Sequence, residues 1–388
     1  MKMRKNLLFF LLGLFIFSSC GQEGKRDSDW LALIEGTEKI TYGEFKHFLD
    51  MTLKMNLSQG EAAVKQKDVE FQKTMLDSFI AQRIVLKEVE ESKIITPELM
   101  DMFQLQALSK YFMYKNITPK LNLPTDAWLT AQYAEKKVKD ELAKRGITSF
   151  EEAKAVLAAE YQKMQYFQVL SDEMKKLKYE YRKKVNDDFE EDIIKKYALD
   201  QLPQQEYAKK WVFQIEGKET TVEEMDRFVK TMILANYGEE GIKRYEKEKE
   251  FRSSIRQQIF EDFFAAILVQ TDAKTKNWIN DAETKSFIKI YTDTEKTKYF
   301  MKSKIATQVE KPTLAEVQVY YNQYKNEIKK PFNEVKNYLE YKIFSEKAEQ
   351  RALRYVERIK NEKKIEINNT FFDSLTPKKE KKEEATKN

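Results

Sequence analysis

The sequence predicts a mainly α-helical protein made of two tandem helical modules, each with short β-strands at its ends. Three observations support this fold class. Long segments place apolar residues every three or four positions, which is the spacing of one helix face. Only 10 of the 388 residues are glycine, so few tight turns are expected. Several motifs recur after about 180 residues, which indicates an internal duplication.

The first 19 residues have the layout of a secretory signal peptide. Lys2, Arg4 and Lys5 give the start a positive charge, and an apolar run follows from Leu7 to Phe17. This run of eleven residues is too short to span a bilayer as a helix, which takes about 20 residues. We therefore expect residues 1–19 to be removed from the mature protein.

Cys20 is predicted to carry lipid. Ser18, Ser19 and Cys20 resemble the lipobox of bacterial lipoproteins, although Phe17 stands where that motif usually has leucine. Cys20 is the only cysteine, so no internal disulfide competes for it. Residues 20–28 are polar and would form a tether from the lipid to the body of the protein. The lipid implies a membrane of the bacterial cell envelope, facing the periplasm or the cell surface; a plain signal peptide with a stray cysteine is the alternative.

The charge balance argues against nucleic acid as a partner. Removing residues 1–19 takes three of the 69 Lys and Arg residues and leaves 66 against 64 Asp and Glu, a net charge of +2. A nucleic-acid-binding protein would carry a clustered positive excess. The 25 Phe, 20 Tyr and 13 Met supply enough apolar surface for a folded chain.

The repeat divides the chain into consecutive modules, at residues 29–200 and 205–372. The matching motifs occur in one order, at offsets of 180 to 188 residues: Trp30–Gly36 with Trp211–Gly217, Thr41–Phe48 with Thr221–Phe228, Lys110–Met113 with Lys298–Met301, Pro124 with Pro312, Tyr133 with Tyr321, and Phe150–Lys154 with Phe332–Lys336. The tail at residues 373–388 is rich in Lys and Glu and is predicted to be disordered.

Each module is expected to open with a strand and a capped helix. Trp30–Ile34 is a short apolar run typical of a buried strand, and residues 36–38 form its turn. Thr41 and Glu44 have the spacing of a capping box, in which each side chain bonds the backbone N–H of the other. The same spacing signals three more helix starts, at Thr221–Glu224, Thr313–Glu316 and Ser149–Glu152.

Longer periodic segments predict the core helices and the closing strands. Four helices are expected as two corresponding pairs, 69–89 with 251–268 and 150–184 with 332–360. The alternation in Lys364–Asn368 predicts a closing strand, which we expect to pair with the strand that starts at Trp211. The corresponding end of module 1, residues 185–188, is a poorer strand.

These segments resemble the SurA/PrsA-type family of periplasmic chaperones. The likeness covers most of both modules and rests on Thr41–Phe45, Met75–Val89, Pro312–Tyr321, Pro331–Lys336 and Lys364–Ile367. It implies two tandem SurA-like helical chaperone modules. In that family a parvulin prolyl isomerase domain commonly lies between the double tyrosine and the Pro-Phe segment. Here only 11 positions separate Tyr321 from Phe332 and 17 separate Tyr133 from Phe150, so the isomerase is expected to be absent.

Motifs for catalysis are missing from the sequence. His47 is the only histidine and has no nucleophile nearby in the sequence, so we interpret it as an ordinary helix residue. No phosphate-binding loop, dinucleotide motif or zinc-ligand cluster occurs. Acidic pairs such as Glu190–Glu191 are typical of solvated helix faces. We therefore expect no enzyme activity, no metal, no cofactor and no small-molecule substrate.

The resemblance implies a membrane-tethered, ATP-independent chaperone, a holdase, for unfolded, nascent or partly folded envelope proteins. Such a protein needs an adaptable apolar lining, which methionine and aromatic side chains supply. The candidate client-binding residues are Met51, Met55, Met102, Phe103, Tyr111, Phe112, Met113, Tyr114, Phe300 and Met301. The same side chains could instead form the core, and the two modules could form one cleft or two.

A structural or interaction lipoprotein with one dedicated protein partner is the competing hypothesis. That function calls for a contiguous exposed apolar patch, whereas a holdase calls for a concave cleft. A degenerate isomerase is a third hypothesis, which is disfavoured by the short segments that follow Tyr133 and Tyr321.

Overall fold

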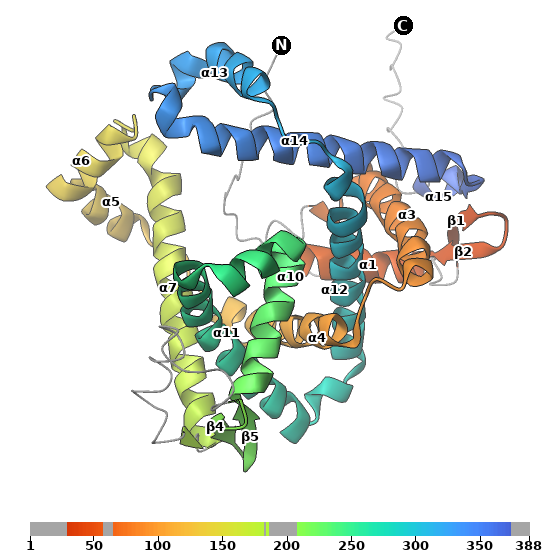
Figure 1. Ribbon diagram of the computed structural model, residues 1–388, viewed down its shortest axis with the longest axis horizontal. Coiled ribbons are helices and arrows are strands. Elements are labelled where there is room, and N and C mark those ends of the chain that lie inside the picture. Colours follow the sequence, from red (N-terminus) through yellow and green to blue (C-terminus); the bar gives the residue numbers. More distant parts are fainter. Residues whose placement is uncertain (1–28, 57–64, 182–183, 186–207, 374–388) are drawn as a thin grey trace, which may run out of the picture. The chain divides into compact units, whose positions relative to one another are not determined.

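The computed structural model describes residues 29–56, 65–181, 184–185 and 208–373 (Figure 1). Most residues in these ranges are helical, so the predicted mainly α fold class is confirmed. The signal peptide, Cys20, the tether and the tail beyond residue 373 lie outside the described residues. No described helix is both long enough and apolar enough to cross a bilayer.

Nearly the same order of elements occurs twice along the chain. The first repeat comprises β1 (Trp30–Ile34), β2 (Glu38–Thr41), α1 (Tyr42–Asn56), α3 (Val69–Ser92), α4 (Pro97–Phe112), the π-helical turn η1 (Met113–Ile117), the 3-10 turn η2 (Thr118–Lys120), α5 (Asp126–Ala134), α6 (Lys136–Lys144), α7 (Phe150–Glu180) and β3 (Lys184–Val185). The second comprises β4 (Trp211–Ile215), β5 (Lys218–Thr221), α10 (Val222–Lys247), α11 (Lys249–Thr275), η3 (Trp278–Asn280), α12 (Ala282–Phe300), η4 (Met301–Ile305), η5 (Ala306–Gln308), α13 (Leu314–Ile328), α14 (Phe332–Asn361), β6 (Ile365–Ile367) and α15 (Asn369–Asp373). Even the π-helical turn recurs, at an offset of 188 residues. The repeats differ in that the second has α13 where the first has α5 and α6, and it adds η3 and α15.

The predicted helix caps and opening strands are present. Each opening strand forms a hairpin with a second short strand, β2 or β5, that the sequence analysis did not predict, and Glu38, expected in the turn, is the first residue of β2. The hairpins turn at Glu35–Gly36 and Glu216–Gly217, where every residue has positive φ, as a type I′ turn requires. At the start of α1 the Thr41 N–H donates to Glu44 Oε2 at 2.9 Å, and the Glu44 N–H donates to Thr41 Oγ1 at 3.2 Å. The same reciprocal bonds cap α10, α7 and α13, at Thr221–Glu224, Ser149–Glu152 and Thr313–Glu316.

The two three-stranded sheets exchange their closing strands between the repeats. β1 pairs antiparallel with β2 and with β6, with Ala32 opposite Ile367. β4 pairs antiparallel with β5 and with β3, with Phe213 opposite Val185. The predicted pairing of the strand at 364–368 with the strand at Trp211 is therefore wrong. The opening strands β1 and β4 present the same apolar pattern. Their sequences therefore do not indicate which of them pairs with the closing strand at 364–368.

Each compact unit combines half of one repeat with half of the other. Among the described residues, unit 1 holds residues 97–289, and unit 2 holds residues 29–96 and 290–373. Unit 1 thus joins the second half of the first repeat to the first half of the second repeat. Unit 2 joins the two remaining halves. The units therefore do not follow the consecutive ranges 29–200 and 205–372 expected from the repeat.

The core of unit 2 joins the N-terminal hairpin to elements from the end of the chain. Ile40 and Phe45 are fully buried on either side of the Thr41 cap, as a hydrophobic staple. α3 packs its predicted apolar face onto them, and its buried residues are Leu76, Phe79, Ile80, Ile84, Val85 and Val89. Ile359 of α14 and Phe371 of α15 complete this core.

The core of unit 1 surrounds Phe213 of β4, which is fully buried. Its ring centroid lies 5.0 Å from that of Phe264 and 6.1 Å from that of Phe263, both on α11. Leu105 and Leu108 of α4 pack into the same cluster. α4, α10 and α11 contact one another pairwise, and this packing forms the base of the cavity described next.

Candidate binding groove

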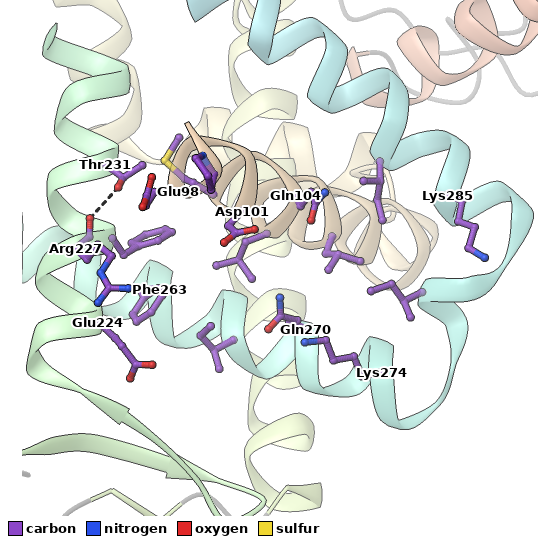
Figure 2. A pocket seen from close by; sticks show the side chains of 18 of the residues that line it. Glu98, Asp101, Gln104, Glu224, Arg227, Thr231, Phe263, Gln270, Lys274 and Lys285 are labelled. Atoms are coloured by element: carbon purple, nitrogen blue, oxygen red, sulfur yellow. Dashed lines mark hydrogen bonds between the residues drawn. The ribbon is translucent and has the colours of Figure 1, made fainter. Parts of the chain in front are cut away.

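A groove of about 760 Å³ opens on unit 1 between α4, α10, α11 and the start of α12 (Figure 2). Its volume lies within the range of about 300–1,000 Å³ that is typical of ligand pockets. The apolar lining residues are Pro97, Met102, Leu105, Leu108, Phe228, Phe263, Ile267, Ile279 and Ile288. The polar lining residues are Glu98, Asp101, Gln104, Glu224, Arg227, Thr231, Gln270, Lys274, Asn280 and Lys285.

Helix periodicity places these side chains along the groove. α4 contributes Glu98, Asp101 and Gln104 at steps of three, and α11 contributes a stripe from Phe263 to Lys274 at steps of three and four. Residues at such steps share one helix face. At a rise of 1.5 Å per residue, the α11 stripe is about 16 Å long. The groove therefore has two helical walls with a defined direction.

The floor of the groove is apolar and partly accessible. Phe228 of α10 stacks on Phe263 of α11 with ring centroids 4.4 Å apart. Phe263 is buried, whereas Phe228, Ile267 and Ile288 are half-buried and keep part of their surface open to the groove. Covering this surface with apolar side chains of a ligand would stabilise a complex by about 25 cal/mol per Å² of area removed from water.

Some of the polar lining side chains are hydrogen-bonded or ion-paired within the protein, and others are not. Glu224 is held in its capping box, and Arg227 pairs with Glu223 at 3.7 Å. By contrast, a second group has no side-chain hydrogen bond or ion pair to any other described residue; it consists of Asp101, Gln104, Gln270, Lys274 and Lys285. The hydrogen-bonding groups of this second group are therefore available to a ligand.

Two polar clusters hold the α11 wall in place, and the first surrounds Asp272. Its carboxylate is buried and accepts hydrogen bonds from the Tyr181 hydroxyl at 2.9 Å and the Trp278 Nε1–H at 2.8 Å. Lys276 lies 2.7 Å from the same carboxylate. Burial, together with the hydrogen bond to Asp272, raises the pKa of Tyr181 to about 12. The cluster fixes the end of α7 and η3 to the part of α11 that carries Lys274.

The second cluster joins α10 to α11 around Arg256, which is buried in spite of its charge. The Arg256 Nε–H donates to the Tyr245 hydroxyl at 2.7 Å, and Arg256 Nη2 lies 3.2 Å from Asp226 Oδ1. The Tyr245 hydroxyl donates to the same Asp226 oxygen at 2.6 Å. Burial, and then the nearby Asp226 charge, raises the pKa of Tyr245. Breaking this network would leave a buried charge without its partner, so it acts as a structural pin.

Most of the residues predicted to bind clients lie in cores. Those with exposed fractions of 2–5% are Met51, Met102, Phe103, Tyr111, Phe112 and Phe300. Those that are half-buried are Met113, Tyr114 and Met301. Within this set only Met102 lines the groove. The Met55 side chain and Cys20 lie outside the described residues.

Tyr111 shows why such residues are structural. Its hydroxyl donates to Glu283 Oε2 at 3.2 Å, and Lys115 lies 2.6 Å from the same oxygen. Burial raises the pKa of Tyr111. The ring and the hydroxyl thus tie α4 to the start of α12, beside the groove rather than in it.

Sequence reasoning missed Phe228, Ile267 and Ile288 as groove residues. Ile267 belongs to the apolar stripe that predicts the helix at 251–268, where groove and core positions look alike. One signal for an accessible helix face was present in the sequence. The apolar stripe continues at helical spacing into the polar residues Gln270 and Lys274.

The described residues include no cluster of three or more His, Cys, Asp or Glu side chains that could hold a metal ion. The groove lining likewise contains no cysteine, serine or histidine. Its side chains can hold apolar groups, hydrogen-bond a main chain and pair with charges.

No protein-family model, curated protein or solved structure matches this chain.

Proposed function

We propose that the protein is a membrane-tethered, ATP-independent holdase that binds unfolded or partly folded envelope proteins and has no prolyl isomerase activity. Its likeness to SurA/PrsA-type chaperones is part of this proposal, as are the signal peptide, the lipid on Cys20 and the location in the cell envelope. Tethering would keep the holdase beside the membrane that its clients must reach.

The groove of unit 1 is the observation that carries the proposal. It combines an open apolar floor with five polar side chains that have no side-chain partner among the described residues, those of Asp101, Gln104, Gln270, Lys274 and Lys285. Exposed backbone and apolar side chains are what an unfolded chain offers and a folded surface does not. A concave site of this composition therefore favours a peptide segment over a flat folded partner.

A dedicated protein partner is the second candidate function, and a different observation favours it. The long helices α7 and α14 expose large apolar side chains: Met164 and Phe167 on α7, and Tyr338, Tyr341 and Leu353 on α14. Met164 and Phe167, and likewise Tyr338 and Tyr341, are one helical turn apart, so each pair shares a face. Such faces suit a protein interface.

Suppression of aggregation tests the proposed function. The chain from Asp27 onward is added to a chemically unfolded outer-membrane-type protein while denaturant is diluted, in the absence of ATP. A holdase keeps the client soluble at substoichiometric to equimolar amounts. If excess protein leaves light scattering unchanged, the proposal is refuted and the dedicated-partner function takes its place.

A further inference from the structure

The charges along the groove are segregated. Figure 2 shows Glu98 and Asp101 toward the α10 end, and Lys274 and Lys285 toward the α12 end. At the α10 end the one lining cation, Arg227, is paired with Glu223. At the α12 end both lysines are exposed and have no acidic partner among the described residues. One end is therefore net acidic and the other net basic.

Two amide side chains lie between the charged ends. Gln104 comes from α4 and Gln270 from α11, so the two opposite walls each contribute one amide (Figure 2). An amide offers both a donor and an acceptor, which matches the alternating N–H and C=O groups of an extended peptide. The backbone of a bound helix bonds to itself and would leave both amides unused.

From this arrangement we propose that the groove binds an extended peptide segment of bipolar charge. Apolar side chains of the peptide lie on Phe228, Ile267 and Ile288, and its main chain bonds to Gln104 and Gln270. Its acidic end lies beside Lys274 and Lys285, and its basic end beside Glu98 and Asp101. A length of about 16 Å accommodates about five extended residues at 3.3 Å each. This inference rests on the proposed function and names the class of segment recognised.

Synthetic nine-residue peptides with one shared apolar centre test the charge preference. The first carries two Lys at one end and two Glu at the other, the second carries Lys at both ends, and the third carries Glu at both ends. Binding to the full chain, purified in mild detergent, is followed by fluorescence anisotropy at low salt. The bipolar peptide is expected to bind about tenfold more tightly than the other two, the gain of roughly two partly exposed ion pairs. This advantage is expected to vanish at about 1 M salt, where screening is nearly complete.

Reversing the basic end changes the preference in a defined direction. Lys274→Glu with Lys285→Glu makes both ends acidic, so the peptide with Lys at both ends becomes the tightest ligand. Lys67→Glu with Lys110→Glu is the matched control, because both lysines are exposed, lie outside the groove and carry the same total charge. The control keeps the bipolar preference. Equal binding of all three peptides to the unaltered chain, or an unchanged preference in the groove variant, overturns the proposal.

The extended conformation has its own readout. Methylating the two central peptide nitrogens removes main-chain donors and is expected to weaken binding about tenfold. Unchanged binding would contradict the assignment of Gln104 and Gln270. The two proposals can fail separately. If all three peptides bind equally and the protein still suppresses aggregation, only the proposed charge preference is refuted. If no peptide binds and aggregation is not suppressed, the proposed holdase function is refuted as well.

Discussion

Ala32 of β1 lies opposite Ile367 of β6, 335 residues later in the chain. The corresponding residues of the other sheet, Phe213 and Val185, face each other in the same way. The closing strand of each repeat therefore completes the sheet opened by the other repeat. Each compact unit consequently needs parts of both repeats, and neither repeat alone contains a complete unit.

A designed disulfide tests this exchange. The Glu35 N–H donates to the Lys364 carbonyl and the Asn368 N–H to the Leu31 carbonyl, so Ala32 and Ile367 form the closer, non-hydrogen-bonded kind of pair. That spacing suits a disulfide. Ala32→Cys with Ile367→Cys, in a chain that also carries Cys20→Ser, is expected to form a bond under mild oxidation.

Mass spectrometry of the digested protein detects the linked peptides. Phe213→Cys with Ile367→Cys is the control, because it represents closure of the second repeat upon itself. A bond in the control and none in the test pair would mean that the strands are not exchanged.

Removal of the Asp272 carboxylate is expected to destabilise unit 1. Asp272→Ala leaves the buried Tyr181 hydroxyl and the Trp278 N–H without their acceptor. The free energy of unfolding should fall by about 3 kcal/mol. Urea unfolding followed by tryptophan fluorescence measures the loss. Asp140→Ala, at an exposed position of α6, is the control and should change stability by less than about 0.5 kcal/mol.

Tyr181 predicts a loss of stability at alkaline pH. Its pKa is raised from 10.0 to about 12 by burial and by Asp272, so the folded state favours the protonated phenol. The resulting stabilisation is complete below pH 10 and is lost as pH rises toward 12. The melting temperature should therefore fall between pH 9 and pH 12, and it should fall less in the Tyr181→Phe variant. An identical decline in both proteins would show that Tyr181 does not contribute.

The helix cap at Ser149 predicts an acid-sensitive step. Hydrogen bonds from the Ser149 side chain and backbone lower the pKa of Glu152 below its ordinary value of 4.5. The part of the cap's stabilisation that depends on the Glu152 carboxylate is therefore complete above pH 4.5 and is lost as pH falls through the lowered pKa, whereas the bond from the Glu152 N–H to Ser149 Oγ remains. Ser149→Ala should lower the melting temperature at neutral pH. Below pH 4 the melting temperatures of the variant and the unaltered protein should lie closer together. A constant difference across the range would contradict this.

Local signals predicted much of the fold. The four capping boxes, the opening strands and the long helices each depend on residues a few positions apart, such as Thr41 and Glu44. The partner strands β2 and β5 were not predicted. Strand exchange depends instead on a choice between two distant partners. Trp30–Ile34 and Trp211–Ile215 share the burial pattern of their side chains, so either could accept the closing strand.

The candidate site was harder to predict than the fold. Phe263 and Ile267 lie on the same helix face as true core residues, and only the packing of α4 and α10 around them separates groove from core. Methionine and aromatic content pointed to residues such as Phe103 and Phe112, which pack inside. Whether a side chain is buried depends on neighbours from both repeats. These neighbours could not be identified from the sequence, because the sequence did not reveal that the repeats exchange halves.

Site-specific photo-crosslinking tests most directly the central claim that the groove holds unfolded clients. A photoreactive amino acid replaces Gln104 or Gln270 in the groove, or the exposed Lys110 of α4 as the control outside it. Each protein is irradiated while an unfolded outer-membrane-type client is diluted from denaturant. We predict covalent adducts with the client from Gln104 and Gln270 and few or none from Lys110. Adducts that are absent from the groove positions, or equally abundant at Lys110, would contradict the claim.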